Sequence, residues 1–251
     1  MQWKVFFASA TGKQHLDGNS PCQDAGHHLA VNDVLIGVVC DGAGSASQGH
    51  LGADFFARRL TELVSASLRS GQFALDTQLD YRDFLVPIIE AARTQLNEVA
   101  VGKELVLRDF ACTVVGCIAS RGRGCFFHIG DGFGICVRNT GESVLSQPEN
   151  GEYADQTYFV TDERWQDHLR LTPLPDIQQG SLIGLMSDGA SPFAVNRAKT
   201  GFFPPFIDPV VSFLSNATEH GGSEALQQVL ESEKTYAITA DDKTLLLALA
   251  S

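Results

Sequence analysis

Three short apolar runs of this chain end in the same two residues, an aspartate followed by a glycine. The runs and their aspartates are 34–40 with Asp41, 125–130 with Asp131, and 182–187 with Asp188. Short runs dense in branched and aromatic side chains are typical of buried β-strands. One Asp-Gly step after a strand usually forms a turn, because aspartate caps its own backbone and glycine accepts a positive φ. Three such steps in one chain weaken the interpretation as simple turns and indicate that the three carboxylates act together.

The other patterns predict two more strands and four helices. The strands are 112–119 and 244–250, and the helices are 51–68, 81–99, 204–217 and 223–231. Apolar residues recur with helical spacing in the two long helical segments. We expect the second of them to start near Asp83, because Pro87 would then lie in the first turn, where proline removes no intrahelical hydrogen bond.

Strands are grouped with strands along this chain, and helices with helices, around an irregular middle from about 141 to 180. A parallel doubly wound sheet would alternate the two. The order therefore favours antiparallel sheets covered by helices, an α+β layered sandwich. No linker or internal repeat divides the 251 residues, so we expect a single domain over 1–251.

Composition excludes several classes of protein. A formal net charge of −12 argues against a nucleic-acid partner, since phosphate backbones attract clustered Lys and Arg. No apolar stretch reaches the roughly 18 to 20 residues of a membrane span, and residues 1–10 lack a secretory signal. We expect a cytoplasmic protein with no nucleic-acid and no membrane partner. The six cysteines form no Cys-x-x-Cys pair and the seven histidines no His-x-x-x-His pair, so any metal is expected to be bound by oxygen.

Further acidic residues extend the set at the strand ends. Asp24 precedes the first apolar run, and Asp241-Asp242 precede the last. If these strand ends are neighbours, the carboxylates repel one another and raise each other's pKa, so the cluster persists only with a cation in it. Carboxylates and backbone carbonyls are hard oxygen donors, which suit Mg²⁺ or Mn²⁺.

Five segments together resemble, in order and approximate spacing, the motifs of the protein phosphatase 2C family of metal-dependent serine/threonine phosphatases. They are Gln23-Asp24-Ala25, Cys40-Asp41-Gly42-Ala43-Gly44-Ser45, Ile129-Gly130-Asp131-Gly132, Met186-Ser187-Asp188-Gly189 and Asp241-Asp242-Lys243-Thr244. The resemblance covers about 9 to 249. Within the family the chain is most similar to a bacterial subgroup, through Gly151-Glu152-Tyr153 and Thr161-Asp162-Glu163.

The resemblance implies a fold and an activity. The family fold packs two antiparallel sheets as a sandwich flanked by α-helices, a four-layer αββα arrangement. The reaction implied is hydrolysis of phosphoserine or phosphothreonine by direct attack of a hydroxide that bridges two Mn²⁺ or Mg²⁺ ions, with a third ion in many members. A phosphorylated protein is the implied substrate, and a Ser/Thr kinase or its targets are implied partners. The segment 141–180 stands where the family carries a variable flap.

The resemblance also implies roles for the acids. Asp41 would bridge two metal ions, with the Gly42 carbonyl beside it. Asp188 and Asp241 would hold the second ion, and Asp24 would act through metal-bound waters. These four aspartates are thus the implied catalytic residues.

Three more positions follow from the same comparison. Asp131 matches the acid that in many members binds the third, weaker ion. Asp242 stands where many members have asparagine, so we expect its side chain to lie behind the metal ligands and not among them. Thr113 either matches a position near the site or is a plain strand residue.

Two departures from the family concern the substrate. Asn19 stands where an arginine often grips phosphate, and Ala43 stands where many members have a histidine that can protonate the leaving group. Arg108 is the first candidate for a replacement phosphate contact, because it lies near the start of a predicted core strand. Lys13 and His15 follow, because they precede the first motif.

Two alternatives to the protein phosphatase stay open. One is a catalytically weak, phosphatase-like binding or regulatory domain, since both departures lie in substrate handling. The other is a small-molecule phosphate monoesterase that uses the same site. The segment Gly42-Ala43-Gly44-Ser45 lacks the Gly-Lys-Ser/Thr ending of a nucleotide-binding P-loop.

Overall fold

The computed structural model describes residues 1–71, 80–148 and 157–251, and within them ten strands form two antiparallel five-stranded sheets. The strands are β1 (Trp3–Ala10), β2 (Asp24–Val31), β3 (Val34–Asp41), β4 (Val114–Ser120), β5 (Arg123–Ile129), β6 (Phe133–Val137), β7 (Ser143–Ser146), β8 (Arg170–Pro175), β9 (Leu182–Met186) and β10 (Lys243–Ala250). The first sheet has the order β1-β10-β9-β6-β7 and the second the order β2-β3-β4-β5-β8. The predicted α+β class is confirmed.

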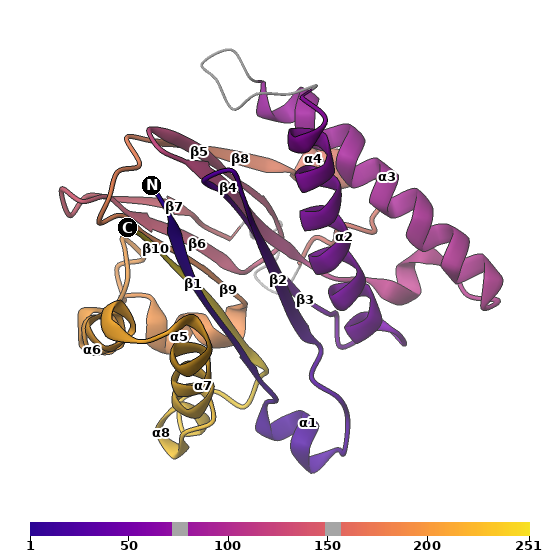
Figure 1. Cartoon of the computed structure of the whole chain (residues 1–251). Helices are drawn as coiled ribbons and strands as arrows, with labels where there is room; N and C mark the ends of the chain where they lie inside the picture. The colour runs from indigo at the N-terminus through magenta and orange to yellow at the C-terminus, as the bar shows by residue number, and fades with distance from the viewer. Residues whose placement is uncertain (72–79, 149–156) are drawn as a thin grey trace.

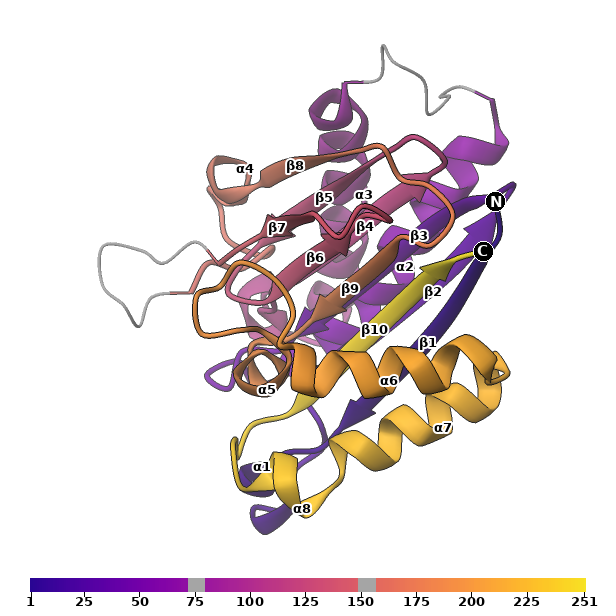
Figure 2. The same cartoon turned by 90° about the vertical axis from the view of Figure 1, so that its left-hand side faces the viewer.

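Helices cover the outer face of each sheet, which gives four layers (Figure 1). They are α1 (Lys13–Asp17), α2 (Gly49–Arg69), α3 (Tyr81–Gly102), α4 (Trp165–His168), α5 (Ser191–Ala194), α6 (Pro204–Asn216), α7 (Glu219–Leu230) and α8 (Glu233–Tyr236), with 3-10 turns η1 (Leu107–Phe110) and η2 (Asp188–Ala190). Figure 2 shows α6 and α7 on the face of the first sheet, opposite α2 and α3. The implied αββα sandwich is thus the observed one.

Apolar side chains fill the space between the two sheets. Leu35, Val39 and Val115 of the second sheet pack with Leu185 and Leu246 of the first, and all five are almost fully buried. Burial on this scale is the main stabilising contribution in a globular fold. It holds the ends of β3 and β9 in a fixed relation, and both ends carry site residues.

The second long helix starts two residues earlier than predicted. Asp80 precedes it, and its side chain accepts hydrogen bonds from the amides of Arg82 and Asp83, a common N-terminal cap. Pro87 therefore lies in the second turn and leaves the Asp83 carbonyl without an amide four residues on. Both Asp83 and Pro87 are exposed, so water can bond this carbonyl.

Five strands escaped the sequence prediction: β1, β2, β6, β7 and β8. Asp24 does not precede the first strand but begins β2, opposite Asp41 of β3. The segment 141–180 is not irregular throughout, because it contains β7, α4 and β8. The motif Gly151-Glu152-Tyr153 lies outside the described residues.

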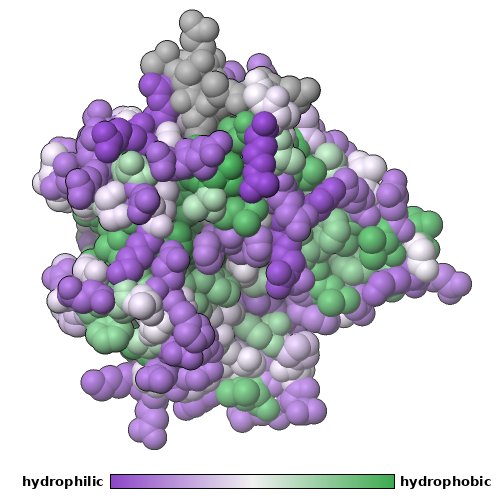
Figure 3. Space-filling model, in the orientation of Figure 1, coloured by the Kyte–Doolittle hydropathy of each residue, from purple (hydrophilic) through white to green (hydrophobic). Residues whose placement is uncertain are grey.

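The face of the molecule that Figure 3 draws is mainly polar, with apolar areas. Figure 3 shows one such area on the side where α2 and α3 lie, and Leu51, Val99 and Val101 are exposed large apolar residues of these two helices. None of the helices in the described parts of the chain has the length and apolar character needed to cross a membrane. All six cysteines are free thiols.

Candidate metal centre

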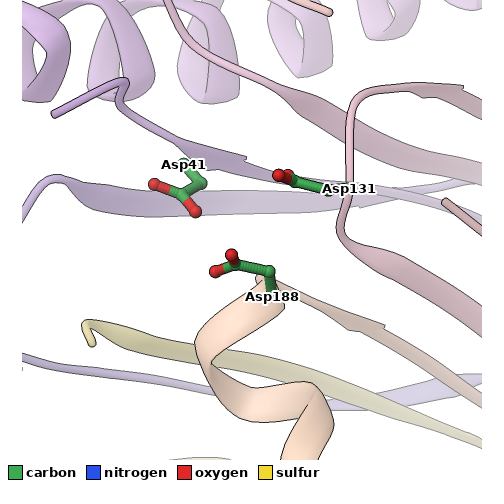
Figure 4. Close-up of side chains that lie close together, drawn as sticks. All are labelled: Asp41, Asp131 and Asp188. Carbon is green, nitrogen blue, oxygen red and sulfur yellow. The ribbon is translucent and has the colours of Figure 1, made fainter. Parts of the chain in front are cut away.

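Three carboxylates from both sheets meet at one end of the sandwich. Asp41 is the last residue of β3, Asp131 follows β5 by two residues, and Asp188 begins η2, separated from β9 by Ser187. One oxygen of each lies within 4.8 Å of the other two. Figure 4 shows the three side chains pointing into one space. Such a group of hard oxygen donors is suited to a divalent cation.

Backbone contacts hold the first of these aspartates in place. The Asp41 amide donates to Thr113 Oγ1 at 3.1 Å, and the Thr113 amide donates to the Asp41 carbonyl at 2.8 Å. The Gly42 amide donates to the Gln23 carbonyl at 3.0 Å. A Cβ at Gly42 would lie 2.5 Å from the Gly49 carbonyl carbon, so only glycine lets the loop approach α2 this closely.

Burial and mutual repulsion make the ionised cluster costly. Burial, followed by the charges of Asp24 and Asp188, raises the pKa of Asp41 well above its ordinary value. Burial with the charges of Asp131 and Asp241 raises the pKa of Asp188 to about 6. Burial raises the pKa of Asp24 to about 7. The folded chain thus concentrates negative charge that water and neighbouring protein groups leave uncompensated.

Unpaired oxygens point to what would compensate this charge. The Oδ1 atoms of Asp24, Asp131 and Asp188 are buried and have no hydrogen-bond partner among the described residues. An orphaned buried carboxylate oxygen is costly, and coordination to a cation would satisfy it. The residues present therefore fit a divalent metal.

Asp24 lies behind the cavity wall, next to Asp41 in the β2–β3 register. Its Oδ2 accepts a hydrogen bond from Ser187 Oγ at 2.7 Å, and the same hydroxyl oxygen accepts one from the Thr244 amide at 3.0 Å. This chain of bonds joins the start of β2 to the residue after β9 and to the start of β10.

The two aspartates before β10 differ in environment. Asp241 is exposed and lines the cavity, and its Oδ1 accepts from the Asp242 amide at 2.9 Å. Asp242 is buried, and its carboxylate accepts from the amides of Gly12 and Gln23, each at 2.6 Å, and from His15 Nδ1 at 2.9 Å. All three donors come from the segment between β1 and β2.

The acids open into a cavity of about 300 Å³. It is lined by Gln14, His15, Gln23, Asp41, Gly42, Ala43, Gly44, Ser45, Thr113, Asp131, Thr157, Phe159, Asp188 and Asp241. Of the three candidates for phosphate contact, His15 lies in this wall. Arg108 is exposed on η1, outside the wall, and Lys13 is directed instead to the Tyr236 ring, with Nζ 5.7 Å from the ring centroid.

Several residues of the site carried no signal in the sequence. Thr157 donates through Oγ1 to Asp131 Oδ2 at 2.6 Å, and it lies in the segment predicted to form the flap. Gln14 and Phe159 line the cavity as well. None of these three residues ends an apolar run or belongs to a charged group, so only the fold brings them to the acids.

The whole chain is similar to bacterial phosphatases. It is 34% identical to serine/threonine-protein phosphatase 3 of Escherichia coli, over 99% of both chains. Among solved structures, a bacterial serine phosphatase has a TM-score of 0.69 at 18% identity and covers 100% of this chain and 98% of its own. Serine/threonine phosphatase Stp1 of Staphylococcus aureus also has a TM-score of 0.69, at 17% identity, over 100% and 96%.

The chain also matches a protein family over most of its length. The family is protein phosphatase 2C, and the match spans residues 11–231, a range that contains Asp24, Asp41, Asp131 and Asp188. With the relative from Escherichia coli, this match covers the fold and most of the metal centre. The chain therefore belongs to the protein phosphatase 2C family.

Proposed function

We propose that this chain is a serine/threonine phosphatase that depends on Mg²⁺ or Mn²⁺. The observation that carries the proposal is the meeting of Asp41, Asp131 and Asp188, whose carboxylate oxygens lie within 4.8 Å of one another. The orphaned oxygens of the site support it, and so does the name of the relative from Escherichia coli. The substrate class, a phosphorylated protein, is taken from that relative.

In this proposal each acid has one task. Asp41 would be shared by two ions and Gly42 would offer its carbonyl, Asp188 and Asp241 would hold the second ion, and Asp24 would act on it through water. Asp131 would hold a third ion. When bound, the ions supply an activated water and neutralise charge on the phosphoryl oxygens. The chain's own part is to hold these carboxylates rigidly, and the paired backbone of Asp41 and Thr113 does so.

Three residues are candidates for recognition of the phosphoryl group: Arg108, Lys13 and His15. His15 is in the cavity wall, whereas the other two would have to reach a phosphopeptide that extends beyond it. If Arg108 contacts the phosphate, Arg108→Ala raises KM for a phosphopeptide about tenfold, as the loss of one charge-assisted contact implies. Metal affinity stays as in the wild type. An unchanged KM would remove Arg108 from the proposal.

The surroundings of the site belong to the same proposal. The segment 141–180 acts as a flap that shapes substrate choice, and Thr157 connects it to Asp131. Residues 1–251 act as one cytoplasmic domain, whose substrates are phosphoproteins made by a Ser/Thr kinase.

One comparison tests the function against its alternatives. The chain is stripped of metal with a chelator, and hydrolysis of a phosphothreonine peptide and of a nucleotide panel is measured with and without Mn²⁺. We expect Mn²⁺-dependent hydrolysis of the peptide. Preference for the nucleotides would favour a small-molecule monoesterase, and no hydrolysis of either would favour a binding domain. Full activity after exhaustive chelation would overturn the metal dependence.

A further inference from the structure

One wall of the cavity contains a histidine that is held by a buried carboxylate. His15 Nδ1 lies 2.9 Å from Asp242 Oδ2, and the side chains are 18% and 2% exposed. An ionised carboxylate only accepts hydrogen bonds, so Nδ1 carries the hydrogen. No described residue gives the other ring nitrogen, Nε2, a hydrogen bond. Because the ring lines the cavity, Nε2 is the atom with which His15 can act there.

A continuous chain of hydrogen bonds fixes this ring relative to the metal centre. His15 and the Gln23 amide both donate to Asp242 Oδ2, and the Gln23 carbonyl accepts from the Gly42 amide at 3.0 Å. The Gly12 amide donates to the second oxygen of Asp242 at 2.6 Å. Since Gly42 follows Asp41 directly, the ring is tied to the same backbone that presents the bridging acid.

The reaction needs a group that can give up a proton. When the phosphorus–oxygen bond to a serine or threonine breaks, its electron pair stays on an alkoxide oxygen, which is strongly basic. A positioned acid that protonates this oxygen contributes about 10²- to 10⁴-fold in rate. Among the described residues of the wall, the four aspartates are occupied by cations in the proposed function, and the amides and hydroxyls do not release a proton near neutral pH. His15 is therefore the remaining candidate for the proton donor.

We propose that His15 is the proton donor to the leaving serine or threonine oxygen, with Asp242 as its positioning residue; this rests on the proposed phosphatase function. The proton moves from Nε2 to the alkoxide oxygen as the bond to phosphorus breaks. The ring becomes neutral and keeps its Nδ1 hydrogen on Asp242. Solvent then returns a proton to Nε2. In this way a residue of α1 supplies the group that Ala43 lacks.

The test compares two substrates that differ in the leaving group. A phosphothreonine peptide releases an alkoxide and needs the proton, whereas p-nitrophenyl phosphate releases a stable phenolate and does not. His15→Asn keeps an N–H donor for Asp242 but cannot protonate a leaving group. We expect kcat of this variant to fall about 100-fold or more on the peptide and to change less than about threefold on p-nitrophenyl phosphate.

A matched variant and a second measurement complete the design. His220→Asn makes the same change on the exposed face of α7, where His220 contacts Glu224, and should leave both rates unchanged. Across substituted phenyl phosphates, His15→Asn should show a steeper dependence of kcat on the leaving group than the wild type, and Asp242→Asn an intermediate one. Equal losses on both substrates would assign His15 to phosphate contact or structure, and no loss on the peptide would also overturn the proposal. A wild type that hydrolyses neither substrate would instead refute the phosphatase function.

Discussion

A buried carboxylate oxygen without a partner is rare in a folded protein, and among the described residues three of them, in Asp24, Asp131 and Asp188, belong to this one site. The arrangement is stable only if something outside the polypeptide offsets the charge. Because the chain keeps every aspartate of the site, a metal-binding enzyme is favoured over a catalytically weak, phosphatase-like binding domain. Because the carboxylates repel one another, the loss of one charge should stabilise the metal-free protein.

Asp41→Asn and Asp188→Asn test this balance. We expect each variant to lose at least about 100-fold in Mn²⁺-dependent kcat, because a ligand of the ions is gone. In the metal-free protein each should melt at a higher temperature than the wild type, because a raised pKa reports a costly charge. Asp208→Asn, an exposed change on α6, should alter neither quantity. A lower melting temperature for both site variants would contradict the repulsion.

Two cysteines lie close to the acids but are not nucleophiles in this account. Burial, followed by the Asp24 charge, raises the pKa of Cys22 to about 12, and burial raises that of Cys40 well above its ordinary value. Both thiols are therefore protonated near neutral pH, and only a thiolate attacks. Cys22→Ser and Cys40→Ser should each keep phosphatase activity within about threefold of the wild type. Trapping of a phosphocysteine would refute this.

At the residue scale, the sequence predicted the aspartates of the site, but it did not predict the contact between His15 and Asp242. Asp41, Asp131 and Asp188 each end an apolar run, so local pattern alone marks them. His15 and Asp242 are 227 positions apart and meet because β1 pairs with β10, Ala10 opposite Lys243. The hydrophobic pattern of a strand sets which of its faces is buried, but it does not name the distant strand that pairs with it, so this contact could not be predicted from the sequence.

At the scale of elements, the loop between β3 and α2 determines the position of Asp41. Gly42 packs against the start of α2, whereas a Cβ at Gly44 would meet only the Gln23 side chain, at 3.7 Å. Gly42→Ala should therefore destabilise the fold by about 2 kcal/mol or more through overpacking and weaken metal binding. Gly44→Ala should change stability by less than about 0.5 kcal/mol. Chemical denaturation of both variants measures this, and equal effects would show that the contact with Gly49 does not matter.

Four of the five strands that sequence reasoning missed, β1, β2, β7 and β8, are edge strands of their sheets, and the fifth, β6, is a short strand between β9 and β7. An edge strand is less enclosed, so its apolar run is shorter or interrupted by polar residues, as His27 and His28 interrupt β2. The central strands β3, β4, β5, β9 and β10 have neighbours on both sides and carry the dense runs that were recognised.

For the whole molecule, the raised carboxyl pKa values predict how stability depends on pH. The pKa is about 7 for Asp24 and about 6 for Asp188, against 3.8 ordinarily, so between these values the folded state holds protons that the unfolded state has released. The metal-free protein should thus lose stability as pH rises from about 4 to 7. A melting temperature that rises with pH over this window would contradict the sign.

Metal should reverse that loss. At a concentration 100 times its Kd, an ion that binds only the folded chain adds about 2.7 kcal/mol. For a chain of this size that corresponds to roughly 5 to 10 °C in melting temperature. The gain from Mn²⁺ should be larger at pH 7.5 than at pH 5, where protons already offset part of the repulsion. A melting curve that saturating Mn²⁺ leaves unchanged would count against a formed site.

The position of β10 in its sheet has a consequence for folding during translation. This strand, Lys243–Ala250, lies between β1 and β9, so β1 has no partner in its sheet until residues 243–250 have been translated and have left the ribosome. Asp241 and Asp242 emerge immediately before it. A nascent chain therefore carries β1 unpaired until this distant segment follows it, and pairing between such distant segments is slow. We expect phosphatase activity to appear abruptly, only when translation has passed this segment.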